Sequence, residues 1–241
     1  MKISEYIALR IDRFPKGMVF TVDDFPSEVT AKQAIMKALS RMVLSAKIAK
    51  LSKGKYYKPQ STVFGHLLPD QYQIVKDLLE NDGKPIGYLT GYSIYNQLGL
   101  TTQVSTSIQI GKNEIRPAFV RERFRISFIK QKNTITKDTI PLLQVLDCIR
   151  TIKVIPGATP GESCSRLIAI IHNLEDKEKA TMVRLALKYP PSTRAVVGAI
   201  LEEIGCGHLT QPLKNSLNHI SVYNVAGITS VLPTASRWNI K

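Results

Sequence analysis

Apolar residues in the first 45 positions recur every three or four residues, which is the spacing of helices with one buried face. A first helix is expected to end before Pro15. A short second helix is expected after Thr21, because Thr21 and Asp24 have the spacing of a capping box. A third helix is expected from Thr30, as its cap, to about Ser45. Its apolar face comprises Ala31, Ile35, Ala38, Leu39 and Met42.

The opposite face of the third helix carries amide, hydroxyl and cationic side chains with few acids. These are Gln33, Lys37 and Ser40, with Arg41 at the edge and Lys32 in the first turn. Such groups reach phosphates and the base edges in the major groove of DNA. We therefore predict that this face contacts DNA.

Two short strands are predicted after this helix, at 48–51 and 56–58, around a turn that contains Gly54. The hairpin carries Lys50, Lys53, Lys55 and Lys58. A basic hairpin beside a helix in the groove can hold the sugar-phosphate backbone. The order helix, short helix, helix, basic hairpin resembles the winged helix-turn-helix of bacterial regulators over nearly all of residues 1–60. A winged helix can also serve purely as a protein-docking module, and this alternative stays open.

A second unit is predicted after a turn-rich boundary at residues 59–69. Residues 105–110 alternate as a strand does, and residues 124–129 are rich in aromatic and branched side chains. Residues 111–117 are expected to form the turn region between these strands. A helix at 139–150 would cover one face of the small mixed sheet that results.

The last part of the chain returns to a helical pattern after a cluster of proline and glycine at 156–161. Helices are expected at 163–174, 177–189 and 192–204, with Asp176 and Ser192 as caps, and one more near 213–219. The predicted fold class is α+β. It comprises a winged helix-turn-helix over 1–60, a small mixed α/β domain over 61–155 and a helical segment over 156–241.

The charge of the chain favours a polyanionic partner. Lysine and arginine number 33 against 19 acidic residues, which gives a net charge of +14. Residues 1–60 hold 12 basic and 5 acidic side chains, so +7 falls in the first quarter of the chain. Nucleic acid is the natural partner of such a segment, although basic residues also keep a surface soluble.

The cysteines are few, odd in number and widely spaced, at Cys148, Cys164 and Cys206. This pattern encodes neither a disulfide framework nor a zinc site and fits a reducing cytoplasm. Charged residues interrupt the amino-terminal apolar run, as they do not in a signal peptide, and no stretch is long enough to span a bilayer. A cytoplasmic protein without cofactor, metal or membrane contact is expected.

The segment from Tyr88 to Thr102, YLTGYSIYNQLGLTT, resembles the AbiEi-type antitoxins of bacterial abortive-infection systems. The resemblance extends over roughly residues 1–150 and implies a winged helix that represses its own promoter. It also implies a domain that opposes a toxin resembling a nucleotidyltransferase, in a type IV system in which the two proteins need not form a stable complex. The match supports Lys32, Gln33, Lys37 and Arg41 as DNA-facing, and it places Tyr92, Ser93 and Asn96 in the shared motif. From the pattern alone, residues 91–98 predict a two-turn helix capped by Thr90.

The sequence gives little sign of an enzyme. The histidines, His66, His172, His208 and His219, fall at no ligand spacing, and no phosphate-cradling glycine loop is present. The best enzymatic alternative is a metal-dependent nuclease with Glu114 and Arg116 as its acid and cation. Against it, Arg121, Arg123 and Arg125 predict an exposed basic strand rather than a catalytic one.

The function predicted is that of a DNA-binding transcriptional autorepressor and antitoxin, acting in phage defence by abortive infection. Its partners would be double-stranded DNA of its own promoter and a nucleotidyltransferase-like toxin, opposed directly or indirectly. A lone transcriptional regulator is the remaining alternative. One winged helix covers a short site, so a homodimer or two cooperating monomers would fill two half-sites.

Overall fold

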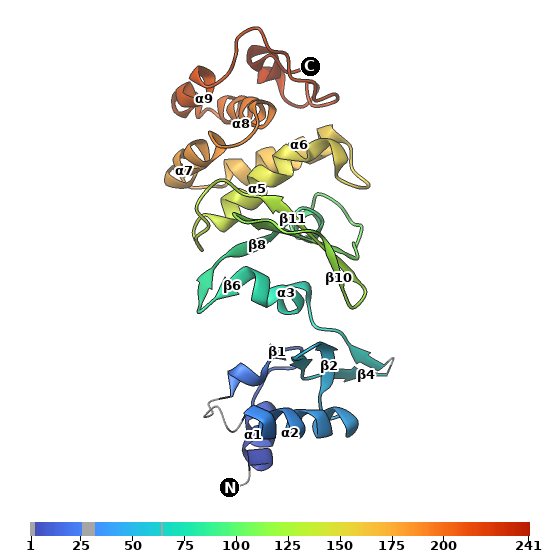
Figure 1. Ribbon diagram of the computed structural model, residues 1–241. Coiled ribbons are helices and arrows are strands. Elements are labelled where there is room, and N and C mark those ends of the chain that lie inside the picture. Colours follow the sequence, from blue (N-terminus) through green and yellow to red (C-terminus); the bar gives the residue numbers. More distant parts are fainter. Residues whose placement is uncertain (1–2, 26–31, 64) are drawn as a thin grey trace. The chain divides into compact units, whose positions relative to one another are not determined.

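A computed structural model describes residues 3–25, 32–63 and 65–241 (Figure 1). The contacts within the chain divide it into two compact units. The first unit contains Met1–Leu78 and Arg121–Arg123, and the second contains Leu79–Val120 and Phe124–Lys241. The predicted domain limits at residues 60 and 155 stay a prediction. The predicted cap Thr30 and its neighbour Ala31 lie outside the described residues.

The first unit begins with helices that the apolar spacing predicts. Its elements are α1 (Ile3–Asp12), β1 (Val19–Phe20), η1 (Val22–Asp24), α2 (Lys32–Leu44), β2 (Ala49–Ser52) and β3 (Lys55–Tyr57). The capping box before η1 is confirmed, because the Asp24 carboxylate accepts a bond from the Thr21 backbone amide at 2.7 Å. The short second helix is a single 3₁₀ turn.

One hydrophobic core joins the helices and strands of the first unit. It consists of Ile7, Ile11, Phe20, Phe25, Ile35, Ala38, Leu39, Ile48 and Tyr56. Strand β3 lies between β1 and β2 and pairs antiparallel with both. Gly54 takes a φ of +74° in the β2–β3 turn, a conformation that costs glycine little. Because Ile48 and Tyr56 belong to the same cluster as Leu39, the hairpin and α2 pack on a shared core.

The rest of the first unit comprises β4 (Gln60–Thr62), β5 (Gly65–Leu67) and most of α3 (Gln71–Leu79). The prediction of an exposed basic strand is wrong at Arg121. Its side chain is only 9% exposed, and its guanidinium donates to the carbonyl of Ile74 at 2.6 Å and to the carboxylate of Asp77 at 2.7 Å. The Arg121 side chain is therefore largely buried because it bonds to Asp77 and Ile74, which lie far from it in the sequence.

The second unit is built on a mixed sheet, as predicted. Its order is β10 (Phe119–Arg121), β11 (Phe124–Lys130), β9 (Ser107–Lys112) and β8 (Gly87–Thr90), and a small hairpin of β6 (Glu80–Asn81) and β7 (Lys84–Pro85) precedes it. Strand β8 pairs antiparallel with β9, whereas β11 pairs parallel with β9. The predicted turn at 111–117 is wrong at its start, because Gly111 and Lys112 belong to β9. A parallel pair needs a longer connection than a hairpin turn.

The predicted two-turn helix at 91–98 is shorter in the structure. Helix α4 covers only Tyr92–Tyr95, and its cap is Gly91, with a φ of +55°. Thr90 is therefore not the cap. Its hydroxyl instead donates to the buried carboxyl of Asp147 at 2.8 Å. A capping threonine accepts a bond from a backbone amide of the helix with its hydroxyl, whereas the buried Thr90 hydroxyl bonds to Asp147.

Helices follow the sheet, which confirms the helical pattern predicted over 163–204 (Figure 1). They are α5 (Ile140–Arg150), η3 (Ile152–Val154), α6 (Pro160–His172), α7 (Asp176–Ala186), α8 (Pro191–Glu203), η4 (Gly207–Leu209), α9 (Gln211–Asn215) and η5 (Pro233–Trp238). The predicted caps are wrong by one or two residues. Glu175 caps α7 where Asp176 was expected, and Pro190 precedes α8 where Ser192 was expected.

The fold class is mixed α and β, in agreement with the predicted α+β class. In the parts of the chain that the structure describes, every helix is too short or too polar to cross a membrane.

Candidate nucleic-acid interface

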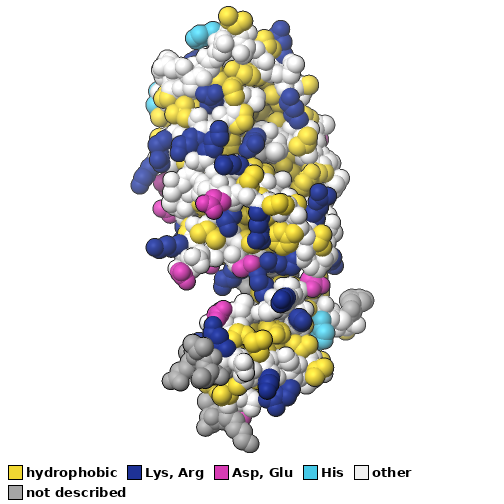
Figure 2. Space-filling view, viewed as in Figure 1, with side chains coloured by type: hydrophobic (Ala, Val, Ile, Leu, Met, Phe, Trp, Pro, Cys, Tyr) yellow, Lys and Arg dark blue, Asp and Glu magenta, His cyan; other side chains and the backbone are white. Residues whose placement is uncertain are grey.

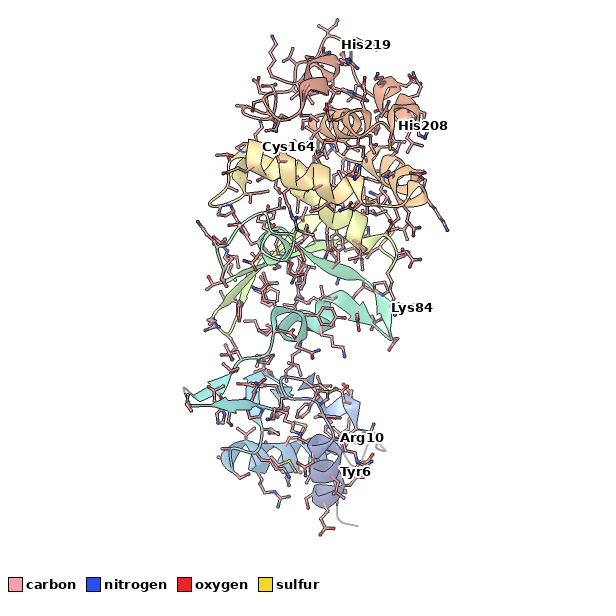
Figure 3. All side chains as sticks on the ribbon, turned by 180° about the vertical axis from the view of Figure 1, so that it is seen from behind. Tyr6, Arg10, Lys84, Cys164, His208 and His219 are labelled. Atoms are coloured by element: carbon pink, nitrogen blue, oxygen red, sulfur yellow. The ribbon has the colours of Figure 1, made fainter. Side chains whose placement is uncertain are left out.

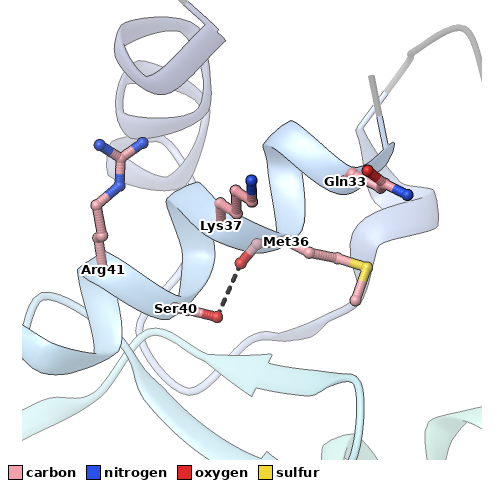
Figure 4. Close-up of a pocket in the computed structure, with 5 residues that line it drawn as sticks. All are labelled: Gln33, Met36, Lys37, Ser40 and Arg41. Atoms are coloured by element: carbon pink, nitrogen blue, oxygen red, sulfur yellow. Dashed lines mark hydrogen bonds between the residues drawn. The ribbon is translucent and has the colours of Figure 1, made fainter. Parts of the chain in front are cut away.

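Helix α2 presents one open face to solvent. A hollow on this face is lined by Gln33, Met36, Lys37, Ser40 and Arg41, which Figure 4 shows along successive turns of the helix. The opposite face buries Ile35, Ala38 and Leu39 in the core. The side chains predicted to contact DNA are therefore exposed, and the helical phase that separates the two faces is confirmed.

The polar groups on this face differ in how far they are engaged. Within residues 3–25, 32–63 and 65–241, Lys37 and Arg41 form no ion pair. Lys32 pairs with Asp23 at 2.7 Å, but both side chains are at least half exposed, so the pair is weak and can open. The hydroxyl of Ser40 donates to the Met36 carbonyl at 2.9 Å, which leaves the oxygen of Ser40 able to accept a bond (Figure 4).

Met36 also belongs to this face, and the sequence interpretation did not include it. Its side chain is 53% exposed although it is apolar. Met36 lies three residues after Gln33 and four before Ser40, so the helical spacing alone was sufficient to find it. An exposed thioether between polar groups suits apolar contact with a base edge such as the thymine methyl.

The hairpin lysines divide into two pairs. Lys50 and Lys53 are exposed and free of ion pairs within the described part of the chain. Lys58 turns inward, where its ammonium donates to the carbonyls of Asp12 and Phe14 at 2.8 and 3.0 Å. Lys55 pairs with Asp77. The prediction that Lys50 and Lys53 contact phosphates stays open, whereas Lys55 and Lys58 already have partners inside the fold.

Asp77 pairs with two cations, Lys55 of the hairpin and Arg121. Its partial burial favours the neutral acid, but the hydrogen bonds from Arg121 and Lys55 outweigh that effect and lower its pKa. The group therefore stays ionised and holds Lys55 beside α3. Neither Asp77 nor Arg121 is close to Lys55 in the sequence, so the hairpin pattern could not reveal this arrangement.

The residues of the predicted antitoxin motif support local structure. Ser93 is buried and its hydroxyl accepts a bond from the Gln109 backbone amide at 3.4 Å. The amide of Asn96 donates to the Thr101 carbonyl at 3.2 Å, which closes the turn after α4. The Tyr92 ring is 38% exposed and packs edge-on against Tyr95. A contact of these residues with a partner stays a prediction.

A buried polar network that the sequence interpretation missed lies behind the mixed sheet. The Asp147 carboxyl is 1% exposed and accepts hydroxyl bonds from Tyr88, Thr90 and Tyr189 at 2.7 to 2.9 Å. The amide of Gln131 donates to both tyrosine oxygens. Burial raises the pKa of Asp147 and of both tyrosines. The network ties β8, the end of β11 and α5 together.

Arg116, the cation of the nuclease alternative, packs on an aromatic ring. The guanidinium of Arg116 lies 4.5 Å from the centre of the Phe119 ring, and Glu114 is exposed. The described residues hold no group of three histidine, cysteine or acidic side chains that could bind a metal ion. Figure 3 shows His208 and His219 on separate segments of the second unit.

Comparisons with known proteins supply a family and a fold. Residues 6–178 match the family of unknown function DUF6088. The crystal structure of the Rv2827c protein from Mycobacterium tuberculosis is similar, with a TM-score of 0.56 and 13% sequence identity over 93% of this chain and 84% of that one. At that identity the likeness concerns the fold. The comparison with curated proteins gives no match.

Proposed function

We propose from the structure that this member of DUF6088, a family of unknown function, is a DNA-binding transcriptional regulator. Its first unit acts as a winged helix-turn-helix. The supporting order is α1, β1, η1, α2, then the β2–β3 hairpin, with α2 as the recognition helix and the hairpin as the wing. The net charge of +7 in residues 1–60 supplies the attraction to duplex phosphates.

The open face of α2 is the observation that carries this proposal. An amide, a thioether, a hydroxyl and two cations follow one another along it, without an acidic side chain among the residues that line the hollow. A solvated helix face generally mixes charges of both signs, whereas a face that reads DNA needs donors, acceptors and positive charge. Lys50 and Lys53 would contact the backbone beside the groove that α2 occupies.

A direct test measures binding to the DNA upstream of the protein's own gene by fluorescence anisotropy at several salt concentrations. Lys37→Ala and Arg41→Ala should each weaken binding and lower the slope of log affinity against log salt by about 0.9, the value for one lost phosphate contact. Lys84→Ala, which removes an exposed cation from the second unit, is the matched control and should change neither quantity. Unchanged affinity in both α2 variants would rule out this reading face.

The role of the regulator within the cell follows from the resemblance at Tyr88–Thr102. We propose that the protein represses its own promoter and opposes a nucleotidyltransferase-like toxin as the antitoxin of a type IV system. The compact second unit, with its own sheet and helices, gives that second activity a place separate from the DNA-reading face. A lone regulator would retain the first activity and lack the second.

A further inference from the structure

A basic pocket lies within the second unit. Its walls come from the end of β11, the end of α5, the segment after α7 and the start of α8. It is lined by Lys130, Gln131, Lys132, Arg150, Leu187, Lys188, Tyr189, Pro190, Pro191 and Arg194. The five cations among them meet no carboxylate in the lining. Figure 2 shows Lys and Arg side chains gathered in a band at the level where Figure 1 labels α7.

These cations differ from three others in the unit, which have acidic partners. Elsewhere in the unit, Lys179 pairs with Asp176, and Arg237 and Lys214 pair with Glu202. Within the described residues, by contrast, none of the five pocket cations forms an ion pair. Like charges held together repel one another, so a cluster without counter-charge is a place where an anion gains the most.

The first turn of α8 holds hydrogen-bond donors beside the pocket. The Nε atom of Arg194 is buried and has no hydrogen-bond partner in the structure, although Nη1 of the same guanidinium donates to the Ser216 carbonyl at 2.8 Å. A buried charged donor without a partner is costly unless a ligand supplies one. Helix α8 also begins here without a side-chain cap, so its first amides and the positive end of its dipole face the same region.

The floor of the pocket consists of buried, hydrogen-bonded side chains. Gln131 and Tyr189 are buried and bonded to each other at 2.9 Å, and Tyr189 donates to Asp147. Burial raises the pKa of Asp147, whereas the hydroxyl bonds that it accepts and the charge of Arg150 oppose that rise. Pro190, Pro191 and Leu187 add an apolar wall suited to a ring or sugar.

We propose that this pocket binds a compact ligand with several linked phosphates, such as a nucleoside triphosphate. All five cations line one hollow, which fits adjacent phosphates of one small molecule better than the spaced phosphates of a duplex. The five positive charges are sufficient to neutralise the linked phosphates of one such ligand. The site is independent of the proposed DNA interface, because all of its lining residues belong to the second unit.

Calorimetric titration of the full-length protein with sodium triphosphate and with a nucleoside triphosphate, at low ionic strength, tests the proposal. The double variant Arg150→Gln/Lys188→Gln alters two exposed side chains and should bind each probe roughly tenfold more weakly or worse. The matched control, Lys137→Gln/Lys177→Gln, removes the same charge from exposed positions of the same unit and should bind as the wild type does. The α2 variant Lys37→Ala/Arg41→Ala should also keep triphosphate binding.

Three results would overturn the proposal. The first is absence of triphosphate binding by the wild-type protein. The second is equal weakening in the pocket variant and its matched control, which would reduce the effect to overall charge. The third is binding of inorganic phosphate as tight as that of triphosphate, or binding of single-stranded RNA alone, which would exclude a site built for linked phosphates.

Discussion

The Asp147 carboxyl is buried in the second unit with three hydroxyl groups directed at it. Burial raises its pKa from the ordinary value of 3.8, so the folded protein holds this proton more tightly than the unfolded chain does. The sign of the linkage follows. The stability that the group contributes is fully present below its unfolded-state pKa and is lost as the pH rises through the raised folded-state pKa.

We therefore expect Asp147→Asn to change the pH dependence of stability. The free energy of unfolding of the wild-type protein, relative to this variant, should fall as the pH rises above 3.8, the ordinary pKa of the carboxyl. Denaturant unfolding at several pH values measures it. Asp138→Asn, which removes an exposed carboxyl, controls for the change in net charge. A difference between wild type and Asp147→Asn that does not vary with pH would contradict the expectation.

At the scale of residues, the sequence predicted what depends on helical phase and missed what depends on distant partners. The exposure of Gln33, Lys37 and Arg41 follows from a helical step of 100° per residue, and all three side chains are exposed in the structure. The ion pair of Lys55 with Asp77 depends on tertiary packing. Asp147 lies within an apolar helical pattern, where nothing local indicates that three hydroxyls will approach it.

Helix α8 shows how one glycine decides the packing of an element. An ideal Cβ on Gly198 would lie 2.1 Å from a ring carbon of Trp238, which belongs to η5. The indole nitrogen of Trp238 donates to the Glu202 carboxylate at 2.8 Å, one helical turn further on. The absence of a side chain at Gly198 therefore lets the indole pack directly against α8.

Replacing Gly198 by alanine should destabilise the protein. In an exposed helix this change stabilises by about 1 kcal/mol, but the rigid indole must move here, and overpacking costs roughly 1–3 kcal/mol. Thermal unfolding should show the loss. The emission of Trp238, the single tryptophan of the chain, should shift to longer wavelength. The double variant Gly198→Ala/Trp238→Leu should lose less than the two single losses added together. Additive losses would mean that the indole and Gly198 do not interact.

At the scale of elements, the apolar pattern located most helices but not the pairing of strands. The spacing of β9 and β11 was visible, whereas their parallel register, Ile108 beside Ile126, depends on which edges meet in the sheet. The local interpretation of 111–117 was a turn region between these strands. The structure instead inserts β10 in the connection and leads the chain back to start β11 in the same direction.

At the scale of the whole molecule, the division into two units predicts that promoter repression and opposition to the toxin can be lost separately. When the proposed toxin from a neighbouring gene arrests growth, co-expression of this protein should restore it. Lys37→Ala/Arg41→Ala should restore growth equally well while losing repression of the protein's own promoter, because both residues lie on α2. Growth curves and a promoter reporter measure the two effects. Failure of the wild-type protein to restore growth would favour the lone regulator.

The assignment of Arg121–Arg123 to the first unit has a practical consequence. The chain leaves the first unit after Leu78, returns for these residues and leaves again at Phe124, so a single cut cannot separate the two units. A fragment that stops at Leu78 would lose the guanidinium that holds the Asp77 carboxylate and the Ile74 carbonyl. Anyone who isolates the amino-terminal unit should graft the Arg121 segment onto it, or expect a weakened fragment whose behaviour misrepresents the parent protein.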